Sequence, residues 1–319
     1  MLSKPVLSSN HISNYTVEKL IGYGGFCKVY KIREISTGKT YAKKEYTNLN
    51  FKISDIQKEI KINKIISKCN SLYTIKYICS NMENTNEDLD EKYIIFELAS
   101  KGALFDYLAI KNKGLSDINC KIIIYKVIKA LQVLKANGIC HRDIDPQNIF
   151  LDGERYQIKL GDFGLSEFIY DENGNKKLSK SKKGKKNFKA PEILNGKKDD
   201  EYDGEKADIY SIGVLLFVLR ICIYPFLKTE FYSIFNEDEQ RYWKIINELI
   251  EKKYNSIIEF DPQFKDLFKN LVNPIPSKRI TFEEILDHPY IKEVTYANEA
   301  QFSIYEDNLI EELNSRFQF

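Results

Sequence analysis

Residues 139–152 read ICHRDIDPQNIFLD, and after a short charged turn residues 157–164 read QIKLGDFG. Among the acidic residues of the two segments, Asp143 and Asp162 lie 19 positions apart (143 to 162), and Asn148 follows the first of them. An enzyme that transfers a phosphoryl group needs one carboxylate to receive the proton of the attacking hydroxyl. It also needs a carboxylate and an amide to hold the magnesium ion that shields the phosphates. The two segments supply all three groups.

The composition is that of an ordinary soluble globular protein, with 319 residues and a hydrophobic content of 43%. The 48 basic and 46 acidic residues leave a formal net charge of +2, which gives no reason to expect nucleic acid as a partner. The six cysteines are scattered without a Cys-x-x-Cys pair, which argues against a zinc site or a disulfide framework and favours the cytoplasm or the nucleus.

The N-terminal residues lack the apolar segment of a signal peptide. The most apolar run, residues 209–226, is interrupted by Arg220 and Pro225, so we expect a buried helix and no membrane span.

The first part of the chain has the pattern of β-strands around a glycine-rich turn. A strand-like segment begins at Tyr15, and Gly22 and Gly24 separate it from a second one. Glycines in such a turn let backbone N–H groups approach phosphate oxygens without a side-chain clash, although a tight hairpin would contain the same residues. A third strand-like segment carries Lys44, which lies 22 positions after Gly22 (22 to 44).

Together these segments resemble the eukaryotic protein kinases of the Ser/Thr type. The resemblance covers roughly residues 15–292 and implies an α+β fold of two lobes, with a small β-rich N-lobe and a larger helical C-lobe. We expect an N-terminal arm at 1–14, an N-lobe at 15–97, a C-lobe at 98–292 and a C-terminal tail at 293–319. Within the tail, residues 304–317 are expected to form a short amphipathic helix that docks on a lobe.

The resemblance also implies the roles of the site residues. Asp143 would position and deprotonate the substrate hydroxyl, Lys44 would hold the α- and β-phosphates of ATP and pair with Glu59, and Asn148 and Asp162 would hold Mg²⁺. The residues expected around ATP are Ile21, Gly22, Gly24, Val29, Ala42 and Lys44 in the strands, the backbone of Glu97 and Ala99 in the hinge, and Phe150.

Other residues would have structural roles. His141 would support the metal-binding loop, Asp208 would cap the backbone of the catalytic loop, and Arg279 would form a buried ion pair with Glu192. At Asn63, four positions after Glu59, related kinases usually have an apolar residue. A polar group there is expected to loosen the active arrangement.

Position 145 departs from the family pattern. Ser/Thr kinases have Lys two residues after the catalytic Asp, where it contacts the γ-phosphate, and this chain has Asp145. A Thr that normally contacts that Lys is replaced here by Lys185, so the two positions have changed as a pair. We interpret this as a repair in which Lys185 supplies the missing ammonium and Asp145 holds it by charge. The alternative is decay, in which the chain no longer transfers phosphate.

Residues 165–189 resemble an activation segment. Ser181 lies three positions before Gly184, where many kinases carry an activating phosphate, and Ser179 is the second candidate. Arg142 would bind that phosphate as a bidentate partner, which would make an upstream kinase a partner of this chain.

The substrate preference can also be predicted from the resemblance. Kinases that select Arg upstream of the target use acidic residues at positions that correspond here to Ala103, Gln147 and Val218. Lys189 lies where the family lines the pocket for the residue after the target. We therefore expect acidic or already phosphorylated protein substrates.

The sequence thus predicts a protein Ser/Thr kinase that uses ATP and Mg²⁺, without nucleic-acid or membrane partners. The alternative is a pseudokinase scaffold that binds ATP with little or no phosphotransfer. Asp145 and Asn63 favour the scaffold, whereas the retained Lys44, Asp143 and their two metal-binding companions oppose it. A phosphotransferase that acts on small molecules fits less well, because the Ala-Pro-Glu sequence at 190–192 is typical of kinases with protein substrates.

Overall fold

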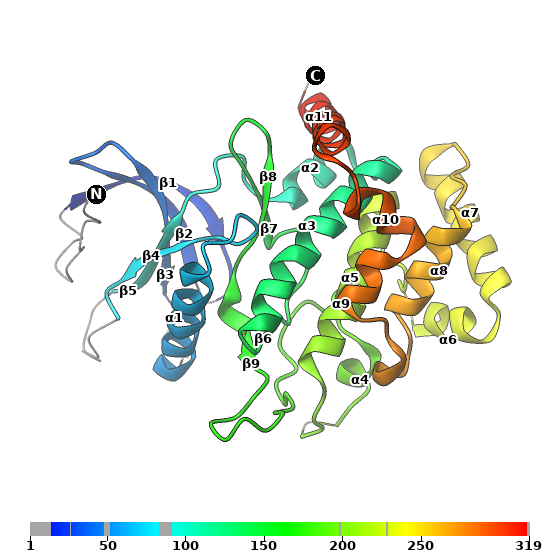
Figure 1. Cartoon of the computed structure of the whole chain (residues 1–319), viewed down its shortest axis with the longest axis horizontal. Helices are drawn as coiled ribbons and strands as arrows, with labels where there is room; N and C mark the ends of the chain where they lie inside the picture. The colour runs from blue at the N-terminus through cyan, green and yellow to red at the C-terminus, as the bar shows by residue number, and fades with distance from the viewer. Residues whose placement is uncertain are drawn as a thin grey trace.

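The chain folds into two lobes that lie side by side, a smaller one built on a β-sheet and a larger helical one (Figure 1). The computed structural model describes residues 14–25, 27–47, 52–82, 91–197, 199–227 and 229–317. The expected α+β architecture is confirmed. Except for Asn14, the predicted N-terminal arm lies outside the described residues.

Five antiparallel strands form the sheet of the N-lobe, in the order β1-β2-β3-β5-β4. The strands are β1 (Tyr15–Tyr23), β2 (Cys27–Glu34), β3 (Thr40–Tyr46), β4 (Tyr77–Ser80) and β5 (Lys92–Glu97). Because successive side chains of a strand point to opposite faces, Tyr93 and Ile95 of β5 pack with Ile32 on one face of the sheet, and Ile94 packs on the other. That second face is covered by α1 (Ile53–Lys68), in which isoleucines recur at helical spacing.

The C-lobe is mostly helical. Its helices are α2 (Leu104–Lys111), α3 (Asp117–Ala136), α4 (Pro191–Leu194), α5 (Gly204–Ile221), α6 (Thr229–Glu237), α7 (Glu239–Tyr254), α8 (Pro262–Leu271), α9 (Phe282–Asp287), α10 (Pro289–Thr295) and α11 (Glu299–Ser315). The C-lobe also contains two pairs of short antiparallel strands. They are β6 (Ile139–Cys140) with β9 (Glu167–Phe168), and β7 (Ile149–Asp152) with β8 (Gln157–Leu160).

Helices α3 and α5 form the centre of the large core. The predicted apolar stripe of α3 is confirmed, since its members are at most 1% exposed: Ile124, Val127, Ile128, Leu131 and Leu134. Residues 209–221 of the apolar run lie in α5 and are almost wholly buried, as expected of a core helix, whereas residues 222–226 lie beyond the end of the helix. A Cβ on Gly213 would lie 2.6 Å from Val272 Cγ1, so only glycine lets α5 approach the end of α8 this closely. Among the described residues, no helix combines the length and the apolarity needed to cross a membrane.

The predicted C-terminal helix is present as α11, although it begins at Glu299 and not at residue 304. Asn298 caps it, with Gln301 completing a capping box. Leu309 and Leu313 are buried in the core of the C-lobe, and each contributes about 1.5–3 kcal/mol by this burial. The helix therefore belongs to the lobe.

Polar contacts fix α11 across the start of α3. Ser116 precedes α3 as expected, but its side chain makes no capping hydrogen bond. Its backbone N–H donates instead to Glu312 of α11 at 3.0 Å. The buried ammonium of Lys126, on α3, pairs with Glu306 at 2.5 Å.

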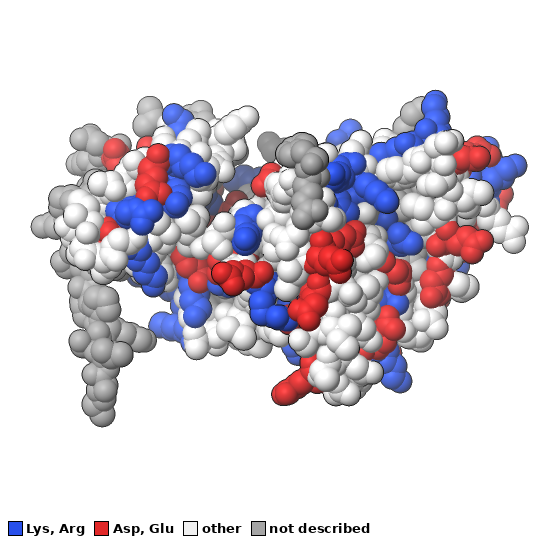
Figure 2. Space-filling model, turned by 90° about the horizontal axis from the view of Figure 1, so that it is seen from above, with Lys and Arg blue, Asp and Glu red and all other residues white. Residues whose placement is uncertain are grey.

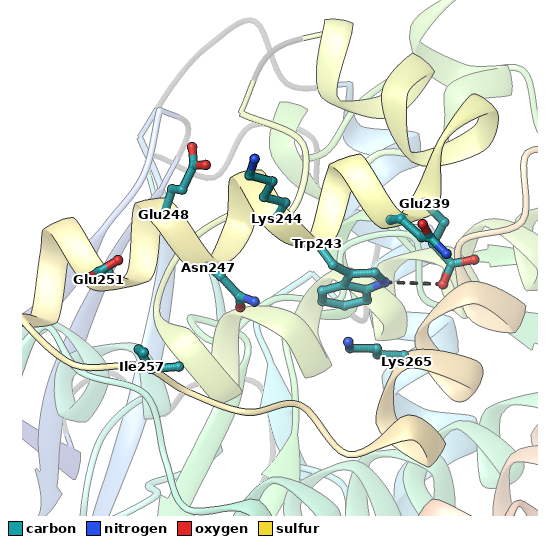
Figure 3. A pocket seen from close by; sticks show the side chains of 9 residues that line it. Glu239, Trp243, Lys244, Asn247, Glu248, Glu251, Ile257 and Lys265 are labelled. Carbon is teal, nitrogen blue, oxygen red and sulfur yellow. Dashed lines mark hydrogen bonds between the residues drawn. The ribbon is translucent and has the colours of Figure 1, made fainter.

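The surface carries charges of both signs. On the face shown in Figure 2, acidic and basic residues are interspersed, in agreement with the small net charge. A groove of about 630 Å³ runs beside α7, where Trp243 donates a hydrogen bond to Glu239 and Lys265 lies over the indole (Figure 3). It lies at the end of the C-lobe that is remote from the sheet (Figure 1), and its lining includes none of the predicted site residues.

Candidate active site

The predicted catalytic loop lies between β6 and β7 and is held by hydrogen bonds to Asp208 of α5. Asp208 accepts the backbone N–H groups of His141 at 2.7 Å and Arg142 at 2.6 Å, one on each carboxylate oxygen. His141 is fully buried, with Nε2 lying 3.1 Å from the carbonyl oxygen of Gly161 and its ring against Phe163. The contacts expected of His141 and Asp208 are thus confirmed. Burial raises the pKa of Asp208 to about 7, although both N–H groups favour its ionised form.

Asn148 ties the loop together around Asp143. Its Nδ2 donates to the carbonyl oxygen of Asp143 at 2.8 Å and to the Oδ2 atom of the same residue at 2.9 Å. The Asp143 carboxylate is half-buried, and its orientation is set from within the loop. A proton-accepting group is effective only when it is held in such a fixed position.

Lys44 of β3 forms ion pairs with carboxylates of both lobes. Its ammonium nitrogen lies 2.8 Å from Glu59 Oε1 of α1 and 2.8 Å from Asp162 Oδ1, so the expected Lys44–Glu59 pair is present. Tyr46 donates its hydroxyl to the other Glu59 oxygen at 2.7 Å. Burial disfavours the charged form of Lys44, but the two carboxylates outweigh it and raise the Lys44 pKa well above its usual value. In the same way, the Lys44 charge outweighs desolvation and lowers the pKa of Asp162.

Asp162 and Asn148 fit the magnesium ion expected here. Asp162 uses Oδ1 for Lys44 and Asn148 uses Nδ2 for Asp143, so within the described ranges Asp162 Oδ2 and Asn148 Oδ1 have no protein partner. Mg²⁺ prefers oxygen ligands and commonly takes only one or two from the protein, with substrate phosphates and water completing its shell. The described part of the chain contains no cluster of three or more His, Cys, Asp or Glu side chains for a metal. The oxygens of Asp162 and Asn148, together with the phosphates of ATP, would hold the ion.

The residues expected around the nucleotide come from both lobes. Val29, Ala42 and Phe150 are half-buried, and Ile21 is 42% exposed. In the hinge, the Glu97 N–H donates to Lys76, whereas the N–H of Ala99 has no partner among the residues that the structure describes. A free donor at that position is what the expected bond to adenine requires.

The glycine-rich turn has room for side chains at Gly22 and Gly24. A Cβ on Gly22 would lie 3.6 Å from the Val29 side chain, and one on Gly24 would lie 3.9 Å from the sulfur of Cys27, both ordinary contacts. These glycines are not required by crowding in the turn itself, so the need for them would come from close approach to a phosphate. Burial raises the pKa of Cys27, which disfavours a reactive thiolate at this position.

The Lys185–Asp145 contact is also present. The ammonium nitrogen of Lys185 lies 2.5 Å from Asp145 Oδ1, and Gln147 donates its backbone N–H to the same oxygen at 2.7 Å. The Asp145 side chain is 2% exposed and that of Lys185 is 37% exposed. Burial raises the pKa of Asp145, and Lys185 opposes this effect. Gly184 precedes Lys185 with φ of +107°, and a Cβ there would meet the carbonyl oxygen of Arg142 at 3.1 Å.

The activation segment meets Arg142 in a way that the sequence did not reveal. Arg142 lies 2.6 Å from Glu167 of β9 and donates to the backbone carbonyl of Ser181 at 2.7 Å. Ser179, a predicted phosphorylation site, is 4% exposed, and its hydroxyl donates to Glu167 at 2.8 Å. The backbone of Ser179 pairs with that of Tyr202, so the hydroxyl of this second candidate is buried in the present arrangement, and its phosphorylation stays a prediction.

Two further contacts bear on the sequence analysis. Arg279 forms the expected ion pair with Glu192, through two hydrogen bonds of 2.7 and 2.6 Å. Asn63 is 1% exposed, and although Nδ2 donates to the Glu59 carbonyl oxygen, its Oδ1 is buried without a hydrogen bond. Tyr46 and Glu167 were not among the site residues predicted from the sequence. Tyr46 was detectable, because a residue two positions after Lys44 in a strand faces the same side.

Comparisons with known proteins agree with this geometry. A family model described as "Protein kinase domain" matches residues 15–291. The chain is 32% identical over 286 residues to a protein named "Probable serine/threonine-protein kinase PLK" of Dictyostelium discoideum, which covers 88% of this chain and 26% of the relative. It is 30% identical over 293 residues to CBL-interacting protein kinase 24 of Oryza sativa subsp. japonica, which covers 90% of this chain and 58% of the relative. The match is thus confined to part of each relative, and the family model spans the sheet of the N-lobe and the C-lobe as far as the start of α10. The chain belongs to the protein kinase family.

Proposed function

We propose that this chain is a Ser/Thr protein kinase that transfers the γ-phosphate of ATP to protein hydroxyls with the help of Mg²⁺. The observation that carries the proposal is the bonded series from Glu59 through Lys44 to Asp162, beside an Asp143 that is oriented by Asn148. The Gly161 N–H donates to the Asn148 carbonyl oxygen at 2.9 Å, so the groups for the phosphates, the metal and the substrate proton are carried by segments that are bonded to one another.

Each group has one task in the transfer. Lys44, held by Glu59, binds and orients the phosphates of ATP. Mg²⁺ neutralises charge on the phosphates when bound, and the free oxygens of Asp162 and Asn148 would hold it. Asp143 accepts the proton of the substrate hydroxyl as that oxygen attacks the γ-phosphorus, and the bond from the γ-phosphorus to the bridging oxygen breaks, so that ADP leaves with the electron pair.

Lys185 would replace the ammonium that the family has at position 145. The pair with Asp145 sets the Lys185 ammonium beside the catalytic loop, one residue after the left-handed turn at Gly184. A positive charge at this point would stabilise the charge that develops on the transferred group. Asp145 would serve as the anchor of that charge.

The proposal extends to acidic protein substrates. Lys189 lines a small cavity together with Asp143 and Lys185, and burial lowers its pKa. Within the described residues, no carboxylate forms an ion pair with Lys189. A substrate carboxylate or phosphate next to the target would pair with this ammonium.

The experiment is γ-phosphate transfer to a generic protein substrate with Mg²⁺ and ATP, with wild type beside Asp143→Asn. We expect transfer by the wild type and loss in the variant, which keeps the size of the side chain but cannot accept the proton. A well-folded wild type that transfers nothing, but whose melting temperature rises with ATP, would identify the pseudokinase scaffold instead. Phosphorylation of Ser181 by an upstream kinase stays a prediction.

A further inference from the structure

Glu167 lies at the meeting point of three elements. Its Oε2 atom is 2.6 Å from Arg142 Nη1 of the catalytic loop and accepts the Ser179 hydroxyl at 2.8 Å. Its Oε1 atom is 3.7 Å from the ammonium of Lys58, which precedes Glu59 in α1. One carboxylate thus contacts the loop that carries Asp143, the activation segment and the helix that carries Glu59.

Arg142 requires an anion at this position. Its side chain is 3% exposed, and a buried guanidinium without a partner is strongly destabilising. Glu167 is 18% exposed and belongs to β9, which pairs with β6 directly before the catalytic loop. The anion is therefore supplied by the fold itself, through a strand pair that fixes its distance from Arg142.

The activation segment around this contact is held in place by hydrogen bonds to Tyr202 and Arg142, without phosphorylation. The backbones of Ser179 and Tyr202 exchange hydrogen bonds of 2.8 and 2.9 Å, and Tyr202 donates its hydroxyl to the Ser181 carbonyl at 2.7 Å. Arg142 binds the same carbonyl. Ser181 thus takes part through its backbone, and a phosphate on the buried Ser179 would displace its bond to Glu167 and place two anions side by side.

We propose that Glu167 is a positioning residue for phosphoryl transfer, which supplies the anion that Arg142 needs and holds the activation segment closed without phosphorylation. This inference rests on the proposed kinase activity. It replaces the phosphate expected on Ser181 by an internal carboxylate, so the active arrangement would be reached by folding alone.

The test uses the full chain, treated with a phosphatase until its intact mass shows no phosphate. We expect the dephosphorylated wild type and Ser181→Ala to keep their kcat. Glu167→Gln, which keeps a hydrogen-bonding group but removes the charge, should lower kcat by about 10²-fold with little change in the KM for ATP, because the loop is misplaced and the nucleotide contacts remain. Glu167→Asp, with a shorter carboxylate, should retain an intermediate kcat. Glu201→Gln is the matched control, since Glu201 pairs with Lys180 at the exposed side of the same segment and should be neutral.

A second measurement does not depend on activity. Hydrogen exchange of residues 165–190 should show protection in the dephosphorylated wild type, and loss of that protection in Glu167→Gln at a similar melting temperature. The proposal is overturned if wild type loses kcat on dephosphorylation, or if Glu167→Gln keeps both its kcat and its protection. If even wild type transfers no phosphate, the kinase proposal fails, and the exchange data still decide whether Glu167 orders the segment.

Discussion

Lys185→Met is expected to lower kcat by about 10²–10³-fold, the usual cost of removing one group that stabilises charge in the transition state. Methionine keeps the length of the side chain and removes its ammonium. The same change leaves the Asp145 carboxylate, which is 2% exposed, without its cation. Because Lys185 is 37% exposed, water screens part of this loss, and the free energy of unfolding should fall by about 1–3 kcal/mol.

A double variant separates the two roles of this lysine. Asp145→Asn combined with Lys185→Met removes the buried charge, so stability should return while kcat stays low. If Lys185 only neutralises Asp145, both quantities should recover together. Asp145→Lys combined with Lys185→Thr restores the arrangement typical of the family and should restore kcat.

The assays are steady-state kinetics at saturating ATP and urea denaturation of the same preparations. Lys186→Met is the matched control, because it removes an exposed ammonium from the neighbouring position, which has no ion pair with Asp145. A Lys185→Met protein with the kcat of wild type would refute the repair hypothesis. Recovery of kcat in the Asn/Met double variant would refute the direct action of Lys185 on the phosphate and leave only its neutralising role.

Three further predictions concern buried polar groups. Glu306→Gln should lower the free energy of unfolding by about 3 kcal/mol, because it leaves the buried Lys126 ammonium without its carboxylate, whereas Asp307→Asn on the exposed side of α11 should change it little in the same denaturation experiment. Asn63→Leu should raise the melting temperature, since it removes a buried oxygen that costs about 1–3 kcal/mol, and an unchanged or lower value would show that Oδ1 is hydrated. The pKa of Asp208 is about 7 in the folded protein and near 4 in the unfolded chain. Between pH 4 and pH 7 the folded protein therefore holds a proton on Asp208 that unfolding releases. The contribution of Asp208 to the free energy of unfolding thus falls as the pH rises from about 4 to about 7. Asp208→Asn should lack this fall relative to wild type in urea denaturation at several pH values, and equal pH slopes would contradict the raised pKa.

The sequence was most informative where neighbouring residues carry the chemistry. Asp143 and Asn148 lie in one loop, and their contact follows from the motif. The Lys185–Asp145 pair, although 40 positions apart (145 to 185), could be predicted because both residues depart from the family pattern together.

Contacts that depend on strand pairing could not be predicted in this way. Glu167 reaches Arg142 only because β9 lies against β6, and two-residue strands have no recognisable period. Ser179 lies in a lysine-rich stretch, of the kind that is typical of a solvated loop, yet its backbone bridge to Tyr202 buries it. Its burial could not be predicted from the polarity of its neighbours, because it depends on a bridge to a residue 23 positions away (179 to 202).

The bond from Ser116 to Glu312 spans 196 residues, which has a consequence for synthesis of the chain. At about 5–20 residues per second, a ribosome needs about 10–40 s after it adds Ser116 to reach Glu312, which accepts the N–H at the start of α3. During that interval Lys126 has no carboxylate from Glu306, and the surface that will receive Leu309 and Leu313 is uncovered. The nascent C-lobe is thus exposed to chaperones and proteases until residues 299–316 have left the exit tunnel.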